Sequence, residues 1–476
     1  MDAGERKRLV VVGGGINGLA AAWRAWETAS EARVEVVLLE AAAEVGGKAK
    51  TRRADGWIFE EGPTGFLGAE GPIEKLVQRS GLTALRADAA AARRFVVRGG
   101  KAREIRMAPP QFAMSGILSL GGLLRIAKEP WIPAKQDDAD ESVWDFAARR
   151  LGPQAADRLV APMVLGVYAG DAKRLSLPAA FPRMAELERE YGGLFKAFFA
   201  LAQVKSEGAP KGGPGGPGGP LLSFADGLQS LPIALAERAP FEVRRGAPLR
   251  GLARDAERGR WMLSVEGADE ALAADAVVLS CDVPASANLL DPLAPAAAAE
   301  LSAISMPGLA VVGLGFSDPV ATRRLPVGFG TLIPRGEGYR SLGVLFDTHL
   351  FPGRSPEGKL LARLMIGGAT DPEAVSLSDG ELLGIAIDDL KRLYGLKAAP
   401  ESYEIARWPA AIPQYELGHL ERVSRIERAL NQLRAHAPGL HLAGCHAKGV
   451  AFAKSAAEGW RVGEVAANEL MEKAAR

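Results

Sequence analysis

The chain has 476 residues, of which 48% are hydrophobic and 24% are charged, proportions typical of a globular protein. At roughly 100–200 residues per domain, this length predicts two or three domains. With 58 basic and 57 acidic residues the net charge is +1, which argues against a polyanionic partner such as nucleic acid. Two isolated cysteines and five scattered histidines argue against a disulfide framework and a metal site, and they fit a reducing compartment.

The N-terminal region is expected to form a β-α-β unit. Leu9–Gly14 is a short apolar run typical of a buried strand, residues 16–28 predict a helix, and Val34–Glu40 predicts a second strand. Basic residues at 6–8 followed by an apolar run also resemble a signal peptide. The glycines inside the run give a better explanation, because they form a ligand-binding pattern.

Three glycines between this first strand and the first helix match the dinucleotide-binding pattern GxGxxG. Gly13 would permit a tight turn, Gly15 would let a pyrophosphate approach the backbone, and Gly18 would allow close helix–strand packing. Free N–H groups at the helix start would bind the phosphates. Glu40 lies 22 residues beyond Gly18, where its carboxylate suits a ribose hydroxyl and would repel a 2′-phosphate. The region is therefore predicted to bind a dinucleotide.

The rest of the chain alternates sheet and helix signals. Two strands are predicted at 94–97 and 103–106, and a helical region at 144–205 begins with Ser142 as its cap and is interrupted by prolines at 162, 178 and 182. The Gly-Gly-Pro repeats of 208–220 predict a mobile loop. Further strands are predicted at 275–280, 311–316, 331–334, 342–347, 360–366 and 440–443, with helices at 378–394 and 455–472. The four strands between 311 and 366 suggest an antiparallel sheet.

Two more glycine-rich segments and a C-terminal segment resemble those of the flavin amine oxidase superfamily. They are Gly46-Gly47-Lys48, Gly62-Pro63-Thr64 and the stretch 444–452. In that superfamily such segments line FAD, so the resemblance implies a non-covalently bound FAD. Lys48 stands where arginine is more common, which keeps the charge but loses the planar fork, and Cys445 stands where asparagine is usual. The residues implied to contact FAD are Gly13, Gly15, Ile16, Asn17, Gly18, Glu40, Ala41, Gly46, Gly47, Lys48, Gly62, Pro63, Thr64, Val243, Trp408, Gly444, Val450, Ala451 and Phe452.

Four segments narrow the resemblance to the protoporphyrinogen oxidase family. They follow one another along the chain at 166–182, 223–232, 328–352 and 407–419. The resemblance implies FAD-dependent oxidation of protoporphyrinogen IX to protoporphyrin IX in haem biosynthesis, with six electrons removed, dioxygen as acceptor and hydrogen peroxide released. No side chain is assigned a catalytic role, because the flavin carries the redox chemistry.

The same resemblance implies a set of substrate contacts. A flat tetrapyrrole needs an apolar slot, in which Phe329 and Leu332 would grip the ring while Arg94 binds a propionate. The full set is Arg94, Gly166, Phe329, Gly330, Leu332 and Met365. Gln414, Tyr415 and His419 also attract attention, but a buried histidine with a partner is more often structural, so no proton transfer is assigned to His419.

The implied fold class is α/β, with a doubly wound Rossmann-like FAD domain, an inserted mixed or antiparallel sheet domain for the substrate, and a helical domain. The predicted boundaries are 1–65, 221–295 and 436–476 for the FAD domain, 66–107 and 296–435 for the substrate domain, 108–205 for the helical domain, and 206–220 for the flexible loop. The apolar run at 112–124 is too short to span a bilayer, but it suggests peripheral contact with the cytoplasmic membrane. We expect a cytoplasmic protein and keep a homodimer as a hypothesis.

Several other interpretations stay open. Coproporphyrinogen III is the alternative substrate, and its four propionates would require more cations than Arg94. A flavin amine oxidase would share the FAD segments but would not need the segments at 166–182 and 328–352. A carotenoid desaturase would need only the glycine motifs. A flavin-binding protein without oxidase activity is supported only by the divergent segment around Cys445.

Overall fold

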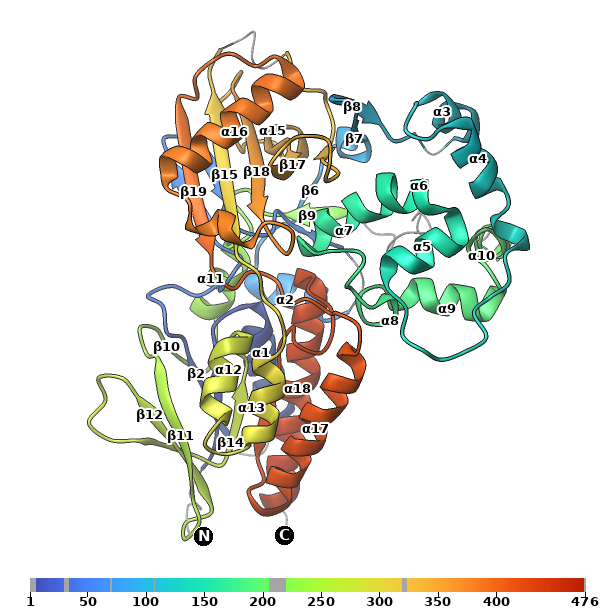
Figure 1. The fold of residues 1–476 in the computed structure, drawn as a ribbon. Helices are drawn as coiled ribbons and strands as arrows, with labels where there is room; N and C mark the ends of the chain where they lie inside the picture. The colour runs from blue at the N-terminus through green and yellow to red at the C-terminus, as the bar shows by residue number, and fades with distance from the viewer. Residues whose placement is uncertain are drawn as a thin grey trace.

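The computed structural model describes residues 6–29, 34–68, 71–106, 108–204, 220–318 and 323–474. Figure 1 shows three regions: a parallel sheet with its helices near both termini, a large mixed sheet above it, and a helical lobe to one side. The predicted mobile loop lies outside the described residues apart from Pro220.

The parallel sheet is buried on both faces. Its order is β10-β2-β1-β14-β20, formed by Glu242–Arg244, Val34–Leu39, Lys7–Val12, Ala276–Leu279 and Leu440–Leu442. Along β1, Leu9 and Val11 face one hydrophobic core, whereas Val10 and Val12 face another. Because successive strand residues point to opposite faces, covering both faces requires the continuous apolar runs that the sequence has.

Each face of this sheet has its own covering layer. Helices α1 (Ile16–Ala29), α2 (Pro72–Ser80), α11 (Ser230–Glu237) and α18 (Phe452–Ala474) contribute to the first core. The second core is covered by α12 (Val283–Leu290), α13 (Pro295–Ser302), α17 (His419–His436) and a small sheet, β11 (Leu249–Asp255), β12 (Arg260–Val265) and β13 (Leu272–Ala274). Helices α2, α13 and α17 pack on the parallel sheet, whereas the predicted boundaries place α2, α17 and nearly all of α13 in the substrate domain.

The large sheet has seven strands and is mixed. Its order is β19-β15-β18-β17-β16-β7-β8, formed by Ser402–Trp408, Leu309–Phe316, Leu360–Gly367, Ser341–Leu345, Gly330–Leu332, Arg94–Arg98 and Lys101–Glu104. Only β16 and β7 run parallel; the other neighbours are antiparallel. Helix α16 (Asp379–Tyr394) covers one face and begins with a capping box between Ser378 and Glu381, as the sequence predicts.

The face of the large sheet opposite to α16 packs against segments from other parts of the fold. The hairpin β3 (Thr51–Ala54) and β4 (Trp57–Glu60) packs there, with Trp57 and Phe59 against Leu361 of β18. Leu361, Arg363 and Met365 alternate with residues that face α16, so all three point to this side. A smaller sheet, β5 (Phe66–Leu67), β9 (Leu221–Ser223) and β6 (Leu85–Arg86), lies nearby.

The helical lobe extends from residue 108 to 204 (Figure 1). Pro162 does not interrupt its helices: a π-helical turn at 156–160 runs directly into α7, and this wider turn lies just before the proline, which cannot donate a backbone hydrogen bond. The lobe is formed by α3 (Pro109–Met114), α4 (Leu120–Ala127), η2 (Glu129–Trp131), α5 (Val143–Leu151), α6 (Pro153–Ala155), η3 (Ala156–Val160), α7 (Ala161–Tyr168), α8 (Leu177–Ala180), α9 (Pro182–Tyr191) and α10 (Leu194–Val204). Short helices elsewhere are η1 (Ala89–Ala92), α15 (Asp347–Leu350) and η4 (Pro372–Ser376).

Candidate functional site

The glycine loop after β1 has the geometry that the GxGxxG pattern predicts. Gly13 has a φ of 111°, and a Cβ there would lie 2.6 Å from the Ser280 carbonyl oxygen. A Cβ on Gly18 would overlap the carbonyl oxygen of Gly13, so this glycine is required for packing. In front of Gly15 the space is open, with the nearest atom, Gly47 Cα, 4.0 Å from an added Cβ. Two glycines thus fix the turn, and the third leaves room for a ligand beside the start of α1.

Glu40 closes one side of this loop at the end of β2. Its carboxylate accepts hydrogen bonds from the backbone N–H groups of Gly14 at 2.6 Å and Ala42 at 2.7 Å. Each carboxylate oxygen retains a lone pair that could accept a ribose hydroxyl. Ala41 is exposed beside it, and Val243 lies on the adjacent strand β10, paired with Leu38.

The second glycine segment lies directly on the first. Gly46 donates its N–H to the Gly14 carbonyl oxygen at 2.9 Å, and Gly47 faces Gly15. Lys48 follows in a largely enclosed position, where burial lowers the pKa of its ammonium group and the nearby Cys445 and Asp282 partly offset that effect. A half-buried cation beside an open glycine cradle fits an anionic group such as a pyrophosphate.

The C-terminal segment, residues 444–452, follows β20, the edge strand of the parallel sheet. Burial raises the pKa of the Cys445 thiol, and Lys48 opposes this rise. Val450 and Ala451 precede the N-terminus of α18, whose first N–H groups lack intrahelical partners, whereas Phe452 is buried against Phe66. The Asn17 side chain is already hydrogen-bonded within the protein: its amide nitrogen donates to the Ser455 carbonyl oxygen, and its amide oxygen accepts from the Ser280 hydroxyl.

The loop at 60–64 is held by side chains of the large sheet. Three successive carbonyl oxygens accept hydrogen bonds: that of Glu60 from Arg363 at 2.8 Å, that of Glu61 from the Trp408 indole at 2.6 Å, and that of Gly62 from Arg363 at 2.7 Å. Arg363 also donates to the Thr64 hydroxyl. Pro63 is exposed at the tip of the loop.

Three of the predicted substrate residues meet between α7 and the large sheet. A Cβ on Gly166 would lie only 2.7 Å from a methyl carbon of Leu332. Met365 and Trp408 both pack against the hydrophobic cluster that contains Leu165, the residue before Gly166. Gly330 is required for close packing within the sheet, since a Cβ there would overlap the Val344 carbonyl oxygen on the neighbouring strand.

Arg94 and Phe329 lie at the other end of the same strands. Arg94 pairs with Gly330, and its guanidinium carbon lies 5.3 Å from the centroid of the Phe329 ring. Arg94 is exposed and forms no ion pair with any residue that the structure describes. An exposed arginine without an acidic partner, positioned against an aromatic ring, can bind a carboxylate of a ligand.

Comparisons with known proteins agree with this geometry. The model of the flavin containing amine oxidoreductase family matches residues 16–468. The chain belongs to this family. It is 31% identical to protoporphyrinogen oxidase 1 of Arabidopsis thaliana chloroplasts, covering 94% of this chain and 85% of the relative. It is 28% identical to coproporphyrinogen III oxidase of Bacillus subtilis (strain 168), covering 94% of each.

A solved structure extends the similarity to three dimensions. The protein from Exiguobacterium sp. 255-15, provisionally named a protoporphyrinogen oxidase, superposes with a TM-score of 0.82 at 26% identity, covering 97% of this chain and 99% of that one. The predicted α/β fold class is therefore confirmed, and this family member is a flavin-dependent oxidoreductase.

Gln414, Tyr415 and His419 of the oxidoreductase have structural partners. Gln414 donates to the Tyr168 and Ile412 carbonyl oxygens, and Tyr415 donates to the Cys445 carbonyl. The His419 ring stacks on Tyr415 with centroids 4.3 Å apart, and burial lowers the pKa of His419 to about 4. These contacts support the C-terminal cofactor segment and favour the structural role that the sequence predicts.

Arg363 is not among the site residues predicted from the sequence. This residue is almost fully buried, and its guanidinium also forms a two-point ion pair with Asp347 at 3.0 and 3.1 Å. The available signal was a single arginine inside the otherwise apolar strand LLARLMIG. A buried charge requires partners, so such an arginine indicates a polar network inside the fold.

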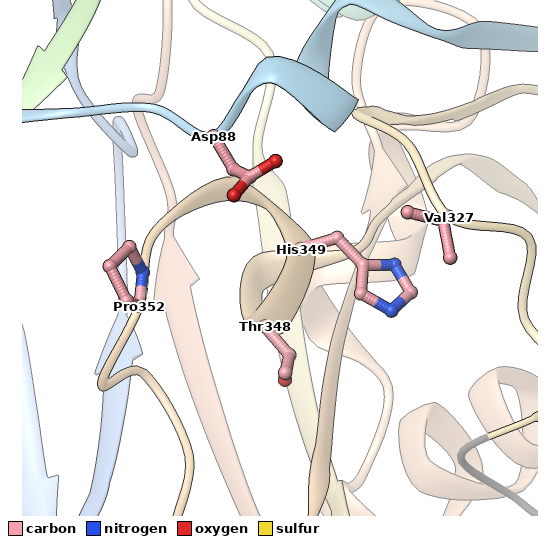
Figure 2. Close-up of a pocket in the computed structure, with 5 residues that line it drawn as sticks. All are labelled: Asp88, Val327, Thr348, His349 and Pro352. Carbon is pink, nitrogen blue, oxygen red and sulfur yellow. The ribbon is translucent and has the colours of Figure 1, made fainter.

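A separate cavity of about 210 Å³ contains none of the predicted residues. Figure 2 shows it lined by Asp88, Val327, Thr348, His349 and Pro352, with the His349 ring directed toward Val327. Burial lowers the pKa of His349, so this ring favours its neutral form. Among the described residues no cluster could hold a metal ion, and none of their helices is long and apolar enough to cross a membrane.

Proposed function

We propose that the protein oxidises protoporphyrinogen IX to protoporphyrin IX with FAD as its cofactor. The observation that carries the proposal is the junction at Trp408. Its side chain packs against the same hydrophobic cluster as Met365, one of the predicted substrate residues, and its indole N–H bonds to the loop at 60–64 that is predicted to line the flavin. The names of the relatives supply the substrate class.

The cofactor segments fit FAD. The open space at Gly15, the Glu40 carboxylate and the half-buried Lys48 suit a pyrophosphate with an adjacent ribose. Bound FAD supplies the two-electron acceptor chemistry, with dioxygen as terminal oxidant, so that protoporphyrinogen IX and three O₂ yield protoporphyrin IX and three H₂O₂. The raised pKa of Cys445 keeps a thiol rather than a nucleophilic thiolate, which supports non-covalent binding.

The protein's own residues orient the substrate. Leu332, Met365 and Phe329 offer apolar surface to a flat ring and exclude water, and the missing side chain at Gly166 lets Leu332 pack closely on α7. Arg94 binds a propionate at the edge. Since each two-electron step removes hydrogen from a different part of the macrocycle, an apolar slot without a fixed catalytic base suits the reaction.

A second substrate has specific support. The Bacillus subtilis relative, named coproporphyrinogen III oxidase, aligns over 94% of both chains. Coproporphyrinogen III differs by carrying propionates where the other substrate has vinyl groups, so both would use the same slot. We place protoporphyrinogen first because four of the first five relatives carry that name.

The experiment that tests the proposal compares both porphyrinogens in air with the purified, FAD-loaded protein. Porphyrin fluorescence should grow well above the autoxidation blank, with one H₂O₂ released per O₂ consumed. A faster rate with coproporphyrinogen would move the substrate to the second candidate. A protein that binds FAD yet oxidises neither compound, while oxidising a primary amine, would overturn the proposal.

We also propose peripheral contact with the cytoplasmic membrane through the helical lobe of a cytoplasmic protein. Met114 and Trp131 are 86% and 79% exposed, and Leu120, Leu124 and Phe199 are exposed on the same lobe. Flotation with liposomes tests this, and protein that stays wholly at the bottom would contradict it. A homodimer remains a proposal that sedimentation velocity can test.

A further inference from the structure

Arg363 and Trp408 connect the two halves of the predicted site. They lie on strands β18 and β19 of the large sheet, on either side of β15. Their side chains donate to the carbonyl oxygens of residues 60, 61 and 62 in succession. A loop usually meets its backbone hydrogen-bonding needs locally or with water, so three consecutive bonds to side chains of another sheet fix its position from outside.

The same two residues lie near the predicted substrate wall, by which we mean Met365 of β18 together with Leu165 and Gly166 of α7. Met365 follows Arg363 by two positions and therefore points to the same side of β18. Trp408 and Met365 both pack against the hydrophobic cluster that contains Leu165. Any shift of the loop relative to this wall would break these bonds.

The arginine is itself rigidly held. Its ion pair with Asp347 is buried, with both side chains 2% exposed. All three nitrogens of the guanidinium donate to protein atoms: Nε and Nη2 to Asp347, Nη1 to the two carbonyl oxygens, and Nη2 to Thr64. Lysine could not reproduce this planar fork. Asp347, Arg363 and loop 60–64 therefore form one continuous polar connection.

We propose that Arg363 and Trp408 are positioning residues that dock loop 60–64 onto the large sheet and so set the distance and tilt between the flavin and the porphyrinogen. This inference rests on the proposed function for the identity of the substrate, but its structural part concerns only the flavin and the loop. Neither residue needs to touch a reacting atom, because both act through the backbone that carries Gly62, Pro63 and Thr64.

The first test is Trp408→Phe, which removes the indole N–H and keeps an aromatic ring. FAD should remain bound at wild-type stoichiometry, because the glycine loop and Glu40 are untouched. The visible circular dichroism of the flavin should change, and hydrogen–deuterium exchange of residues 58–68 should accelerate. With porphyrinogen, kcat should fall about tenfold at nearly unchanged KM, because small displacements of reacting partners lower rates steeply.

Trp261→Phe is the matched control. Like Trp408, Trp261 donates its indole N–H to a carbonyl oxygen, that of Pro438 at 3.2 Å, but it is fully buried and lies beside the parallel sheet, whereas Trp408 is half-buried. Its loss should lower the unfolding temperature without altering the flavin dichroism. Trp408→Phe with wild-type dichroism and wild-type exchange at 58–68 would overturn the inference.

The second test is the neutral pair Arg363→Gln with Asp347→Asn, which avoids leaving a buried charge without its partner. It should reproduce the spectroscopic change of Trp408→Phe and lower kcat about a hundredfold, since two carbonyl bonds are lost together. Arg150→Gln with Glu129→Gln removes an equally buried pair in the helical lobe and should leave the flavin spectrum unchanged.

The two hypotheses fail in distinguishable ways. A wild-type protein that binds FAD but oxidises no porphyrinogen would overturn the proposed function, while dichroism and exchange of the loop would still test the docking role. A wild-type protein that retains no flavin would overturn both. Normal activity in the wild type with no change in either Arg363 or Trp408 variant would overturn the docking role alone.

Discussion

The cofactor end and the substrate end of the site are built in different ways. At the cofactor end, Gly13, Gly15 and Gly18 lie within six consecutive residues, and Gly18 packs directly on the Gly13 carbonyl oxygen. At the substrate end, Gly166 and Leu332 come from a helix and a strand that meet only in the folded chain. An added methyl group should therefore be tolerated least at Gly18, where it meets backbone, whereas at Gly166 it meets the end of the flexible Leu332 side chain, so that affinity or rate should change without loss of the fold.

The largest effect is expected from Gly18→Ala. The added methyl group would overlap the Gly13 carbonyl oxygen, so α1 must move away from β1. Such overpacking destabilises a core by roughly 1–3 kcal/mol or more, and it would also displace the phosphate-binding turn. We expect a lower unfolding temperature and loss of FAD at micromolar concentrations, measured by thermal denaturation and by flavin absorbance after gel filtration.

Gly15→Ala separates folding from binding in the same loop. Its methyl group would enter open space, so the unfolding temperature of the flavin-free protein should stay within a few degrees of wild type, as for most changes away from packed atoms. FAD binding should nevertheless be lost, because the methyl group occupies the space predicted for the pyrophosphate. Gly15→Ala protein that retains FAD would contradict the assignment of this loop.

The next largest effect is expected from Glu40→Gln. The change removes a charge from the acceptor of the Gly14 and Ala42 N–H groups and weakens the predicted ribose contact. FAD affinity should fall about 30-fold, equivalent to about 2 kcal/mol for hydrogen bonds to a charged group. Titration of flavin-free protein with FAD gives the dissociation constant. Glu35→Gln, on the same strand but paired with Arg8 at 2.8 Å, is the matched control and should leave it unchanged.

This contrast also explains what could be predicted from the sequence. The parallel sheet and its glycine loop were predictable, because continuous apolar strands and fixed glycine spacing are local signals. The hairpin β3–β4, strand β19 and helix α17 were not predicted, and their stability comes from packing on distant segments rather than from their own patterns. Arg363 could not be predicted for the same reason. Its partners Glu60, Gly62 and Asp347 contact it in the fold but are distant along the chain, so no local sequence pattern links them to it.

Lys48 gives the cofactor end a predicted pH dependence. Burial lowers its pKa in the flavin-free protein, and a pyrophosphate beside the ammonium group would raise that pKa again. Binding of FAD should therefore take up a proton. As the pH rises through the lowered pKa, FAD affinity should fall, by at most about tenfold per pH unit, the limit for one proton.

Lys48→Arg separates this effect from other titrations. Arginine keeps its charge across the whole range, so FAD affinity should lose its dependence on pH while remaining tight. Fluorescence titrations between pH 7 and 10, a range chosen below the ordinary lysine pKa of about 10.4, measure both proteins. An equal pH dependence in the two proteins would show that another group titrates, and would remove Lys48 from the pyrophosphate site.

The smallest effect, and the one that most sharply separates the two ends, is expected from Arg94→Gln. The side chain is exposed and makes no ion pair within the described chain, so its removal should leave both the unfolding temperature and FAD binding unchanged. If Arg94 binds a propionate equally in the bound substrate and in the transition state, KM should rise about tenfold while kcat stays constant.

Arg93→Gln is the neighbouring control for Arg94→Gln. Because Arg93 is already paired with Glu104 at 3.1 Å, its substitution should change neither KM nor kcat. A fall in kcat at constant KM would contradict simple carboxylate binding, and an equal rise in KM for Arg93→Gln would indicate a general loss of positive charge. Comparing the rise in KM for protoporphyrinogen and coproporphyrinogen then shows whether Arg94 alone holds the propionates: the substrate with four propionates should lose a smaller fraction of its binding if other cations share them.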